Sequence, residues 1–199
     1  MSQTVDYFFA TQSPWTYLGH ARFMAMAKAA GASVRVKPMD LGKVFPVSGG
    51  LPLAKRPVQR QAYRLVELKR FGDHLKQPLH IQPKFFPVAG DDAARLIIAV
   101  DQHDSTQAAL KMAGAVFAAV WAQERDIASA VVLAELLKEC GLDAMRLEQS
   151  RSQDVMQTYE KYTQQAIDLG VFGAPSYVID SEIFWGQDRL DFVARKLGV

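Results

Sequence analysis

The stretch FFATQSPWTYLGHARF, residues 8–23, contains the transition on which the fold depends. It begins inside an almost continuously apolar run, residues 5–10, which predicts a strand buried on both faces. Pro14 suits the first turn of a helix, where its missing N–H costs nothing, and Ser13 before it is a favoured N-cap residue. Apolar residues then recur at helical spacing until Gly31. We therefore predict a strand that leads directly into a long helix.

A second strand is predicted immediately after this helix. Val34 and Val36 alternate with Arg35 and Lys37 before Pro38, which is typical of a strand with one wetter face. A strand, a helix and a second strand in this order form a β-α-β unit. Such crossovers normally join parallel strands.

The C-terminal end of the chain returns to strand-forming sequence. Residues 176–179 and 182–185 are two β-rich runs around Asp180-Ser181, the spacing of a tight hairpin. Gly186 ends the second run, and residues 187–197 predict a closing helix. The C-terminal order is therefore β-β-α.

The middle of the chain has a helical pattern. From Asp40 to Pro57, repeated glycines and prolines predict a long loop, which leads into an amphipathic helix at residues 59–75. Further helical patterns occupy about 91–103, 106–123, 126–140 and 151–169. The chain is thus of the α/β class, with a helical block between the β-α-β and β-β-α parts.

Composition excludes several classes of partner. The formal net charge is +2, and the 23 basic and 21 acidic residues are mixed along the chain, so no nucleic acid or membrane surface is expected as a partner. No run approaches the ~18 apolar residues that a membrane span requires. Residues 1–10 lack the features of a secretory signal, and Cys140 is the only cysteine. A single cysteine fits a reducing compartment, so we expect a cytoplasmic protein.

A metal site is not predicted. The four histidines show neither ligand spacing nor thiolate partners, which favours surface or packing roles; they are His20, His74, His80 and His103. Cys140 precedes Gly141 at an apparent helix end and is interpreted as a small structural residue.

Three motifs together give the chain a family resemblance. They are SPWTYLG at 13–19, VFGAPSYV at 171–178 and FWGQDRL at 184–190, and PKFFP at 83–87 adds a further landmark. The chain resembles the kappa-class glutathione transferases and, more closely, the bacterial 2-hydroxychromene-2-carboxylate isomerases. The resemblance covers nearly the full length. It implies a thioredoxin-like fold (β-α-β, then β-β-α) with a large all-helical insertion: residues 1–40 and 168–199 form the thioredoxin-like domain, and residues 41–167 the insertion.

Ser13 stands where thioredoxin-type proteins begin a Cys-x-x-Cys motif at the start of their first long helix. A helix N-terminus lowers the pKa of a thiol held there. Ser13 and Thr16 replace both cysteines, so the sulfur would have to come from a ligand. The resemblance implies that this ligand is glutathione and that Ser13 is the catalytic residue, donating a hydrogen bond to its sulfur. The alternative is an ordinary N-cap serine before proline.

Two other segments are implied to hold the rest of glutathione. Ala174 and Pro175 correspond to a loop with a cis-proline, which faces the helix start and can pair main chain to main chain with a peptide. A simple strand-entry proline is the alternative. The γ-glutamyl end would be held at a second helix start, by Trp185, Gly186, Gln187 and Asp188. The alternative there is a glycine turn followed by a routine capping aspartate.

The resemblance also implies four residues that contact the second substrate: Phe45, Lys55, Arg56 and Phe86. Lys55 and Arg56 can pair with a carboxylate, although a basic pair beside a proline is also typical of solvated surface. Phe45 and Phe86 stand where the isomerases are expected to have a lysine and a tyrosine. These two changes remove polar groups from the substrate site while leaving the glutathione site intact.

The sequence thus predicts a cytoplasmic, glutathione-dependent isomerase that acts on a small aromatic conjugated carbonyl acid. Two alternatives stay open: a kappa-like glutathione transferase, and a noncatalytic thioredoxin-like binding protein. Relatives are described as dimers, so a homodimer is expected.

Overall fold

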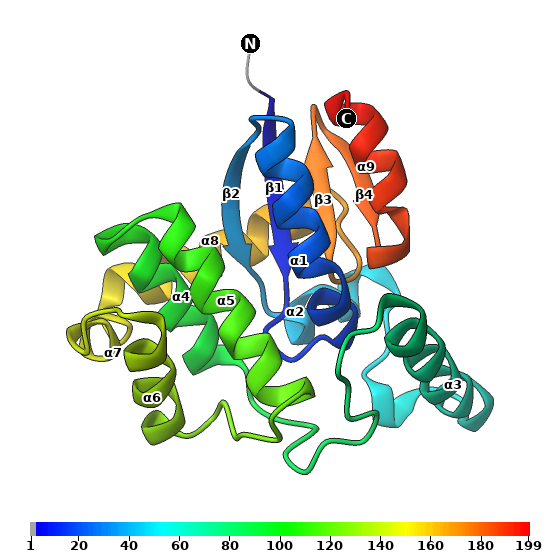
Figure 1. Ribbon diagram of the computed structural model, residues 1–199, viewed down its shortest axis with the longest axis horizontal. Coiled ribbons are helices and arrows are strands. Elements are labelled where there is room, and N and C mark those ends of the chain that lie inside the picture. Colours follow the sequence, from blue (N-terminus) through cyan, green and yellow to red (C-terminus); the bar gives the residue numbers. More distant parts are fainter. Residues whose placement is uncertain (1–2) are drawn as a thin grey trace.

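One four-stranded sheet organises the protein, as seen in a computed structural model that describes residues 3–199 (Figure 1). The strand order is β2-β1-β3-β4. Strand β1 pairs in parallel with β2 and antiparallel with β3, and β3 pairs antiparallel with β4. The strands are β1 (Thr4–Phe9), β2 (Ser33–Pro38), β3 (Ser176–Ile179) and β4 (Glu182–Trp185). The predicted β-α-β and β-β-α units are confirmed.

The hairpin between β3 and β4 turns through Asp180 and Ser181. Both residues have left-handed backbones, with φ of 51° and 65°. Two successive positive φ values are typical of the tight hairpin turn whose twist matches that of the strands. The turn predicted from this dipeptide is therefore present.

Helices cover both faces of the sheet. Alternate residues of β1 point to opposite faces, so Tyr7 and Phe9 join one buried cluster while Phe8 joins another. The face with Tyr7 carries α1 (Pro14–Ala29) and α9 (Leu190–Leu197), which pack together. The face with Phe8 carries α2 (Leu41–Ser48) and α8 (Gln153–Asp168), which lie behind the sheet in Figure 1.

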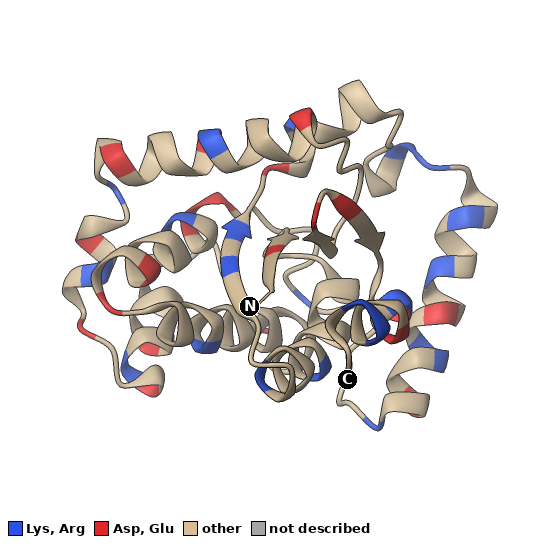
Figure 2. Ribbon diagram, turned by 90° about the horizontal axis from the view of Figure 1, so that it is seen from above, with Lys and Arg blue, Asp and Glu red and all other residues tan. Residues whose placement is uncertain are grey.

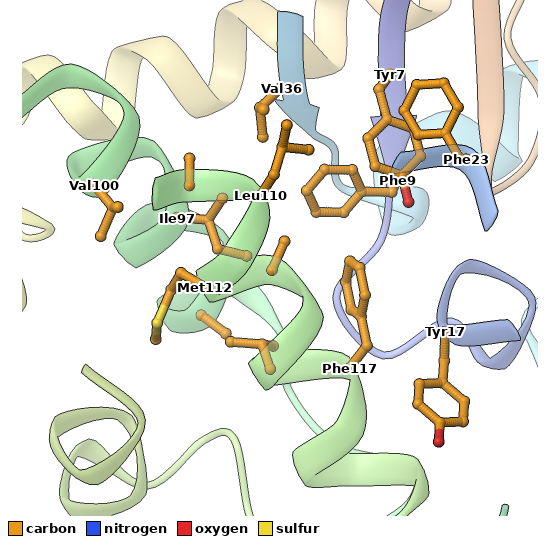
Figure 3. Close-up of a cluster of buried hydrophobic side chains, with 14 of the residues drawn as sticks. Tyr7, Phe9, Tyr17, Phe23, Val36, Ile97, Val100, Leu110, Met112 and Phe117 are labelled. Carbon is orange, nitrogen blue, oxygen red and sulfur yellow. The ribbon is translucent and has the colours of Figure 1, made fainter. Parts of the chain in front are cut away.

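The helical block packs against the sheet. Helices α4 and α5 lie side by side and contact both each other and β2. The rings of Phe9 in β1 and Phe117 in α5 meet edge to face with centroids 5.3 Å apart, as Figure 3 shows. One buried cluster thus runs from the sheet into the block. The helices of the block on this side are α3 (Val58–Leu75), α4 (Asp91–His103), α5 (Thr106–Trp121), α6 (Ala130–Cys140) and α7 (Met145–Gln149).

The prediction of one long loop from Asp40 to Pro57 is wrong for α2, because residues 41–48 form a helix. The Asp40 Oδ1 atom accepts a hydrogen bond from the Gly42 N–H at 2.7 Å and so caps a helix of two turns. Pro46 lies inside this helix, where it removes only one internal hydrogen bond. The same segment contains a short 3₁₀ turn, η1 (Leu53–Lys55).

Charged residues of both signs are spread over most of the structure (Figure 2). On α3, the helix at the right of that view, Lys and Arg recur with acidic residues between them. Within residues 3–199, no helix combines the length and apolar character needed to cross a membrane.

Candidate functional site

Ser13 occupies the N-cap of α1, directly after β1. Its Oγ accepts a hydrogen bond from the Thr16 N–H at 3.2 Å, and its own N–H donates to the Ala10 carbonyl at 3.0 Å. The first turn of α1 contains no acidic residue, so nothing in it cancels the positive end of the helix dipole. The side chain is buried, at 7% exposure. Ser13 is thus the cap of α1 and stands at its positive end.

The Ala174–Pro175 peptide bond is cis and lies against Ser13. The Ser13 hydroxyl donates to the Ala174 carbonyl at 3.4 Å, across 161 positions of sequence. The structure therefore brings together the first two predicted parts of the site. A hydrogen bond at 3.4 Å is long for an O–H donor, so this proton is weakly held and can turn to a stronger acceptor.

The Trp185–Asp188 segment adjoins this loop. The Gly186 N–H donates to the Pro175 carbonyl at 2.9 Å, and the Trp185 ring stacks edge to face on Phe172 at 4.8 Å. Gly186 has φ of 105°, a backbone that favours glycine. The third predicted part thus lies next to the second, although the Gly186 N–H already has a partner within the protein.

Gln187 and Asp188 differ in their surroundings. Gln187 is buried, at 2% exposure, and both its backbone carbonyl and its side-chain Oε1 accept hydrogen bonds from Arg22 of α1. Its side chain therefore faces α1 rather than a ligand. Asp188 is exposed and pairs with the adjacent Arg189 at 2.7 Å. These residues begin a short 3₁₀ turn, η2 (Gln187–Arg189), which leads into α9.

No protein thiol lies at this helix start. Thr16 is fully buried, and its Oγ1 has no hydrogen-bond partner among the residues that the structure describes. Cys140, the single cysteine of the chain, ends α6, and α5 lies between α6 and α1 in Figure 1. Burial raises the pKa of the Cys140 thiol. A reactive sulfur at Ser13 must therefore come from outside the chain.

The four predicted substrate residues fall in two groups. Phe45, on α2, places its ring over Gly50, while Lys55 is exposed at the end of η1. Arg56 is partly buried and its Nε donates to the Leu51 carbonyl at 2.8 Å. Phe45 thus lies on α2, and Lys55 and Arg56 lie in the segment between α2 and α3.

Phe86 belongs to a different segment from the other three substrate candidates, the one between α3 and α4. Its ring packs on Trp121 with centroids 4.8 Å apart, and Arg64 of α3 lies over the same ring. Burial, and secondarily the charge of Arg56, lowers the pKa of Arg64, so Arg64 is near both Arg56 and Phe86.

Sequence reasoning missed several residues around Ser13. Thr11 donates from Oγ1 to the Gly90 carbonyl at 2.9 Å, and a Cβ on Gly90 would meet the side chains of Thr11 and Gln12. The segment that follows the PKFFP motif therefore supports the turn before α1. Thr11 and Gln12 lie inside the motif region, but their partner at position 90 has no local sequence signal.

No metal site is evident. Across residues 3–199, no three or more His, Cys, Asp or Glu side chains are grouped to hold a metal ion. His20 is buried, with Nδ1 3.2 Å from the Tyr7 hydroxyl and Nε2 3.0 Å from the Leu110 carbonyl. It therefore has the packing role predicted for the histidines.

Comparisons with known proteins find relatives that match nearly the full chain. A 2-hydroxychromene-2-carboxylate isomerase of Sphingobium xenophagum is 29% identical, with 97% of both chains covered. A glutathione S-transferase kappa 1 of Caenorhabditis elegans is 25% identical, over 96% of this chain and 88% of that protein. The solved structure of a 2-hydroxychromene-2-carboxylate isomerase superposes with a TM-score of 0.82 at 25% identity, covering 98% of this chain and 94% of that one.

The family model of the DSBA-like thioredoxin domain matches residues 4–198. The match includes both the sheet and the helical block, which share one buried cluster. The chain therefore belongs to the DSBA-like thioredoxin domain family.

Proposed function

We propose that the protein is a glutathione-dependent isomerase of the 2-hydroxychromene-2-carboxylate isomerase type, with an aromatic conjugated carbonyl acid as its substrate. The observation that carries the proposal is the Ser13 hydroxyl, which stands at a helix N-terminus beside a cis-proline loop where the chain has no thiol. The full-length similarity to two isomerases and a kappa-class transferase supports the same class of chemistry.

The residues present fit glutathione. The Ser13 Oγ already accepts the Thr16 N–H, which polarises the hydroxyl, and its proton makes only the long bond to Ala174. A thiolate would be a better acceptor for that proton than the Ala174 carbonyl. The cis Ala174–Pro175 bond beside Ser13 supports the proposal that this loop pairs with the glutathione peptide, although the Pro175 carbonyl already accepts the Gly186 N–H.

When bound, glutathione would supply a nucleophilic thiolate for reversible addition to a conjugated carbonyl acid, the chemistry by which a double bond is isomerised. Ser13 would hold that sulfur in its ionised form through its hydroxyl and the α1 dipole. Asp188 and the N–H groups of η2 would bind the γ-glutamyl end, with Trp185 and Gly186 shaping the turn. Gln187 would act only through the position of this turn, because its side chain is bound to Arg22.

Isothermal titration with glutathione, followed by pH titration of the bound thiol through its ultraviolet absorbance, tests the proposal. Ser13→Ala should raise the pKa of bound glutathione. Ser105→Ala is the matched control, because Ser105 caps α5 in the same way, with its Oγ 3.1 Å from the Ala108 N–H. Each substitution should lower stability by about 1 kcal/mol through loss of the cap. An equal thiol pKa in both variants would remove Ser13 from the mechanism.

The two alternatives give different results in the same assays. A noncatalytic binding protein would show no turnover of aromatic enone acids with glutathione present. A transferase would consume glutathione and release a conjugate, whereas an isomerase leaves the glutathione concentration unchanged. Absence of glutathione binding at millimolar concentration would contradict both glutathione-dependent functions.

The expected homodimer and cytoplasmic location remain part of the proposal. Light scattering of the purified protein over a range of concentrations tests the first, and cell fractionation the second. A mass that stays at 22.1 kDa would contradict the dimer.

A further inference from the structure

Arg64 lies across two aromatic rings at the junction of three segments. Its Cζ atom is 5.1 Å from the centroid of Phe86, in the segment after α3, and 5.6 Å from that of Trp121, at the end of α5. Trp121 is fully buried and Arg64 is partly buried. The guanidinium is therefore packed against an apolar wall rather than extended into solvent.

This guanidinium has no charged partner. In the described part of the chain, Arg64 makes no ion pair and no hydrogen bond, whereas Arg70 farther along α3 pairs with Glu67 at 2.7 Å. Burial, and secondarily the charge of Arg56, lowers the pKa of Arg64 to about 10. Arg64 thus stays positive at neutral pH although burial opposes its charge.

The surrounding charges have the same sign. Arg60 and Arg64 are four residues apart on α3, so they lie on one side of its start, and Arg56 lies just before the helix. Burial, and secondarily the charge of Arg60, lowers the pKa of Arg56, and Arg56 has the same secondary effect on the pKa of Arg64. Three adjacent cations attract an anion and repel other cations.

The cluster is on the side of the molecule where α1 begins. The segment with Phe86 runs on to Gly90, whose carbonyl accepts the Thr11 hydroxyl two residues before Ser13. On the other side of Ser13, the Trp15 ring meets Phe71 of α3 edge to face at 6.0 Å. The segment that carries Phe86 and the helix that carries Arg64 are therefore both in contact with residues that flank Ser13.

We propose that Arg64, seated on Phe86 and Trp121, binds a carboxylate of the ligand that meets the Ser13 site, and that this carboxylate belongs to the second substrate. The proposal rests on the proposed function, since it places a conjugated carbonyl acid beside a glutathione sulfur. A guanidinium stacked on rings keeps its N–H edge free for two parallel hydrogen bonds to one carboxylate. The rings hold the cation in place, so less side-chain freedom is lost on binding.

Binding of cinnamate and of its neutral analogue cinnamamide, measured by isothermal titration, tests the proposal. Arg64→Gln should weaken cinnamate binding about tenfold or more, the usual effect of losing a hydrogen-bonded charge, and leave cinnamamide unchanged. Arg64→Lys keeps the charge but loses the planar fork of N–H groups. Its affinity for cinnamate should therefore lie between those of wild type and Arg64→Gln. Arg70→Gln is the matched control on the same helix, because Arg70 is exposed and already paired.

Separate titrations with glutathione identify the source of the carboxylate. If Arg64→Gln weakens the binding of glutathione and not that of cinnamate, the carboxylate is the glycine end of glutathione. The assignment to the second substrate is then overturned. Equal affinities of wild type and Arg64→Gln for both anions, or no cinnamate binding by wild type, would also overturn it. If wild type binds cinnamate through Arg64 but no glutathione, the proposed function fails while the Arg64 site stands.

Discussion

The free energy of unfolding should fall as the pH is lowered from 6.5 to 4, because His20 resists protonation in the folded protein. Its ring is buried between the Tyr7 hydroxyl and the Leu110 carbonyl. The carbonyl can only accept, so Nε2 carries the proton and Nδ1 accepts from Tyr7. Protonation would add a charge in this closed space, where a Cβ on Gly114 would already stand 3.2 Å from the ring. Burial accordingly lowers the pKa of His20 from 6.5 to about 4.

The magnitude follows from the difference between the two pKa values. As the pH falls below 6.5, the unfolded chain binds a proton at His20 that the folded chain does not bind until about pH 4. At about 1.36 kcal/mol per pH unit, the free energy of unfolding falls by about 3 kcal/mol across this window. The contribution is fully present above pH 6.5 and is lost by pH 4.

Urea denaturation of wild type and His20→Gln at several pH values between 7 and 4 measures this effect. Carboxylates titrate in both proteins and cancel in the difference. We expect wild type to lose about 3 kcal/mol relative to His20→Gln over the range. A difference that does not vary with pH would refute the reasoning, as would a His20 pKa near 6.5 in an NMR titration of the native protein.

Three further predictions concern the buried cluster, the turn before Ser13 and the single cysteine. Phe117→Ala should lower the free energy of unfolding by about 3–5 kcal/mol, because the ring is fully buried against Phe9; a loss below about 1 kcal/mol in urea denaturation would contradict this packing. Gly90→Val should displace the turn before Ser13 and weaken glutathione binding, because its Cβ would meet Thr11; unchanged binding by titration would show that the turn tolerates the side chain. Cys140 should react more slowly with a disulfide reagent in the native protein than in urea, because burial raises its thiol pKa, and equal rates would disprove this protection.

Much of the fold was predictable because its signals are local. The Ser13-Pro14 helix start and the Asp180-Ser181 turn each depend on a few adjacent residues. The α2 helix was missed because Pro46 and the nearby glycines outweighed the capping signal of Asp40, which is also local. Proline is a strong helix breaker on average, but a two-turn helix loses only one hydrogen bond to it.

The site was less predictable because its contacts join distant segments. Family motifs indicated Ser13 and the cis-proline loop, and the structure places them in contact. No periodicity or motif showed that Arg22 would bind Gln187, or that Arg64 would lie on Phe86 and Trp121. Such pairs depend on tertiary packing, which a single sequence does not reveal.

The position of β3 has a consequence for how the protein is made. Strand β3 lies between β1 and β4, so one edge of β1 stays unpaired until residues 176–179 leave the ribosome. An unpaired apolar strand edge invites wrong pairing with other chains. The Ser13 turn likewise gains its Ala174 neighbour only when nearly all of the chain has been synthesised. Nascent chains that stall before this point would therefore present an aggregation-prone edge and an incomplete site.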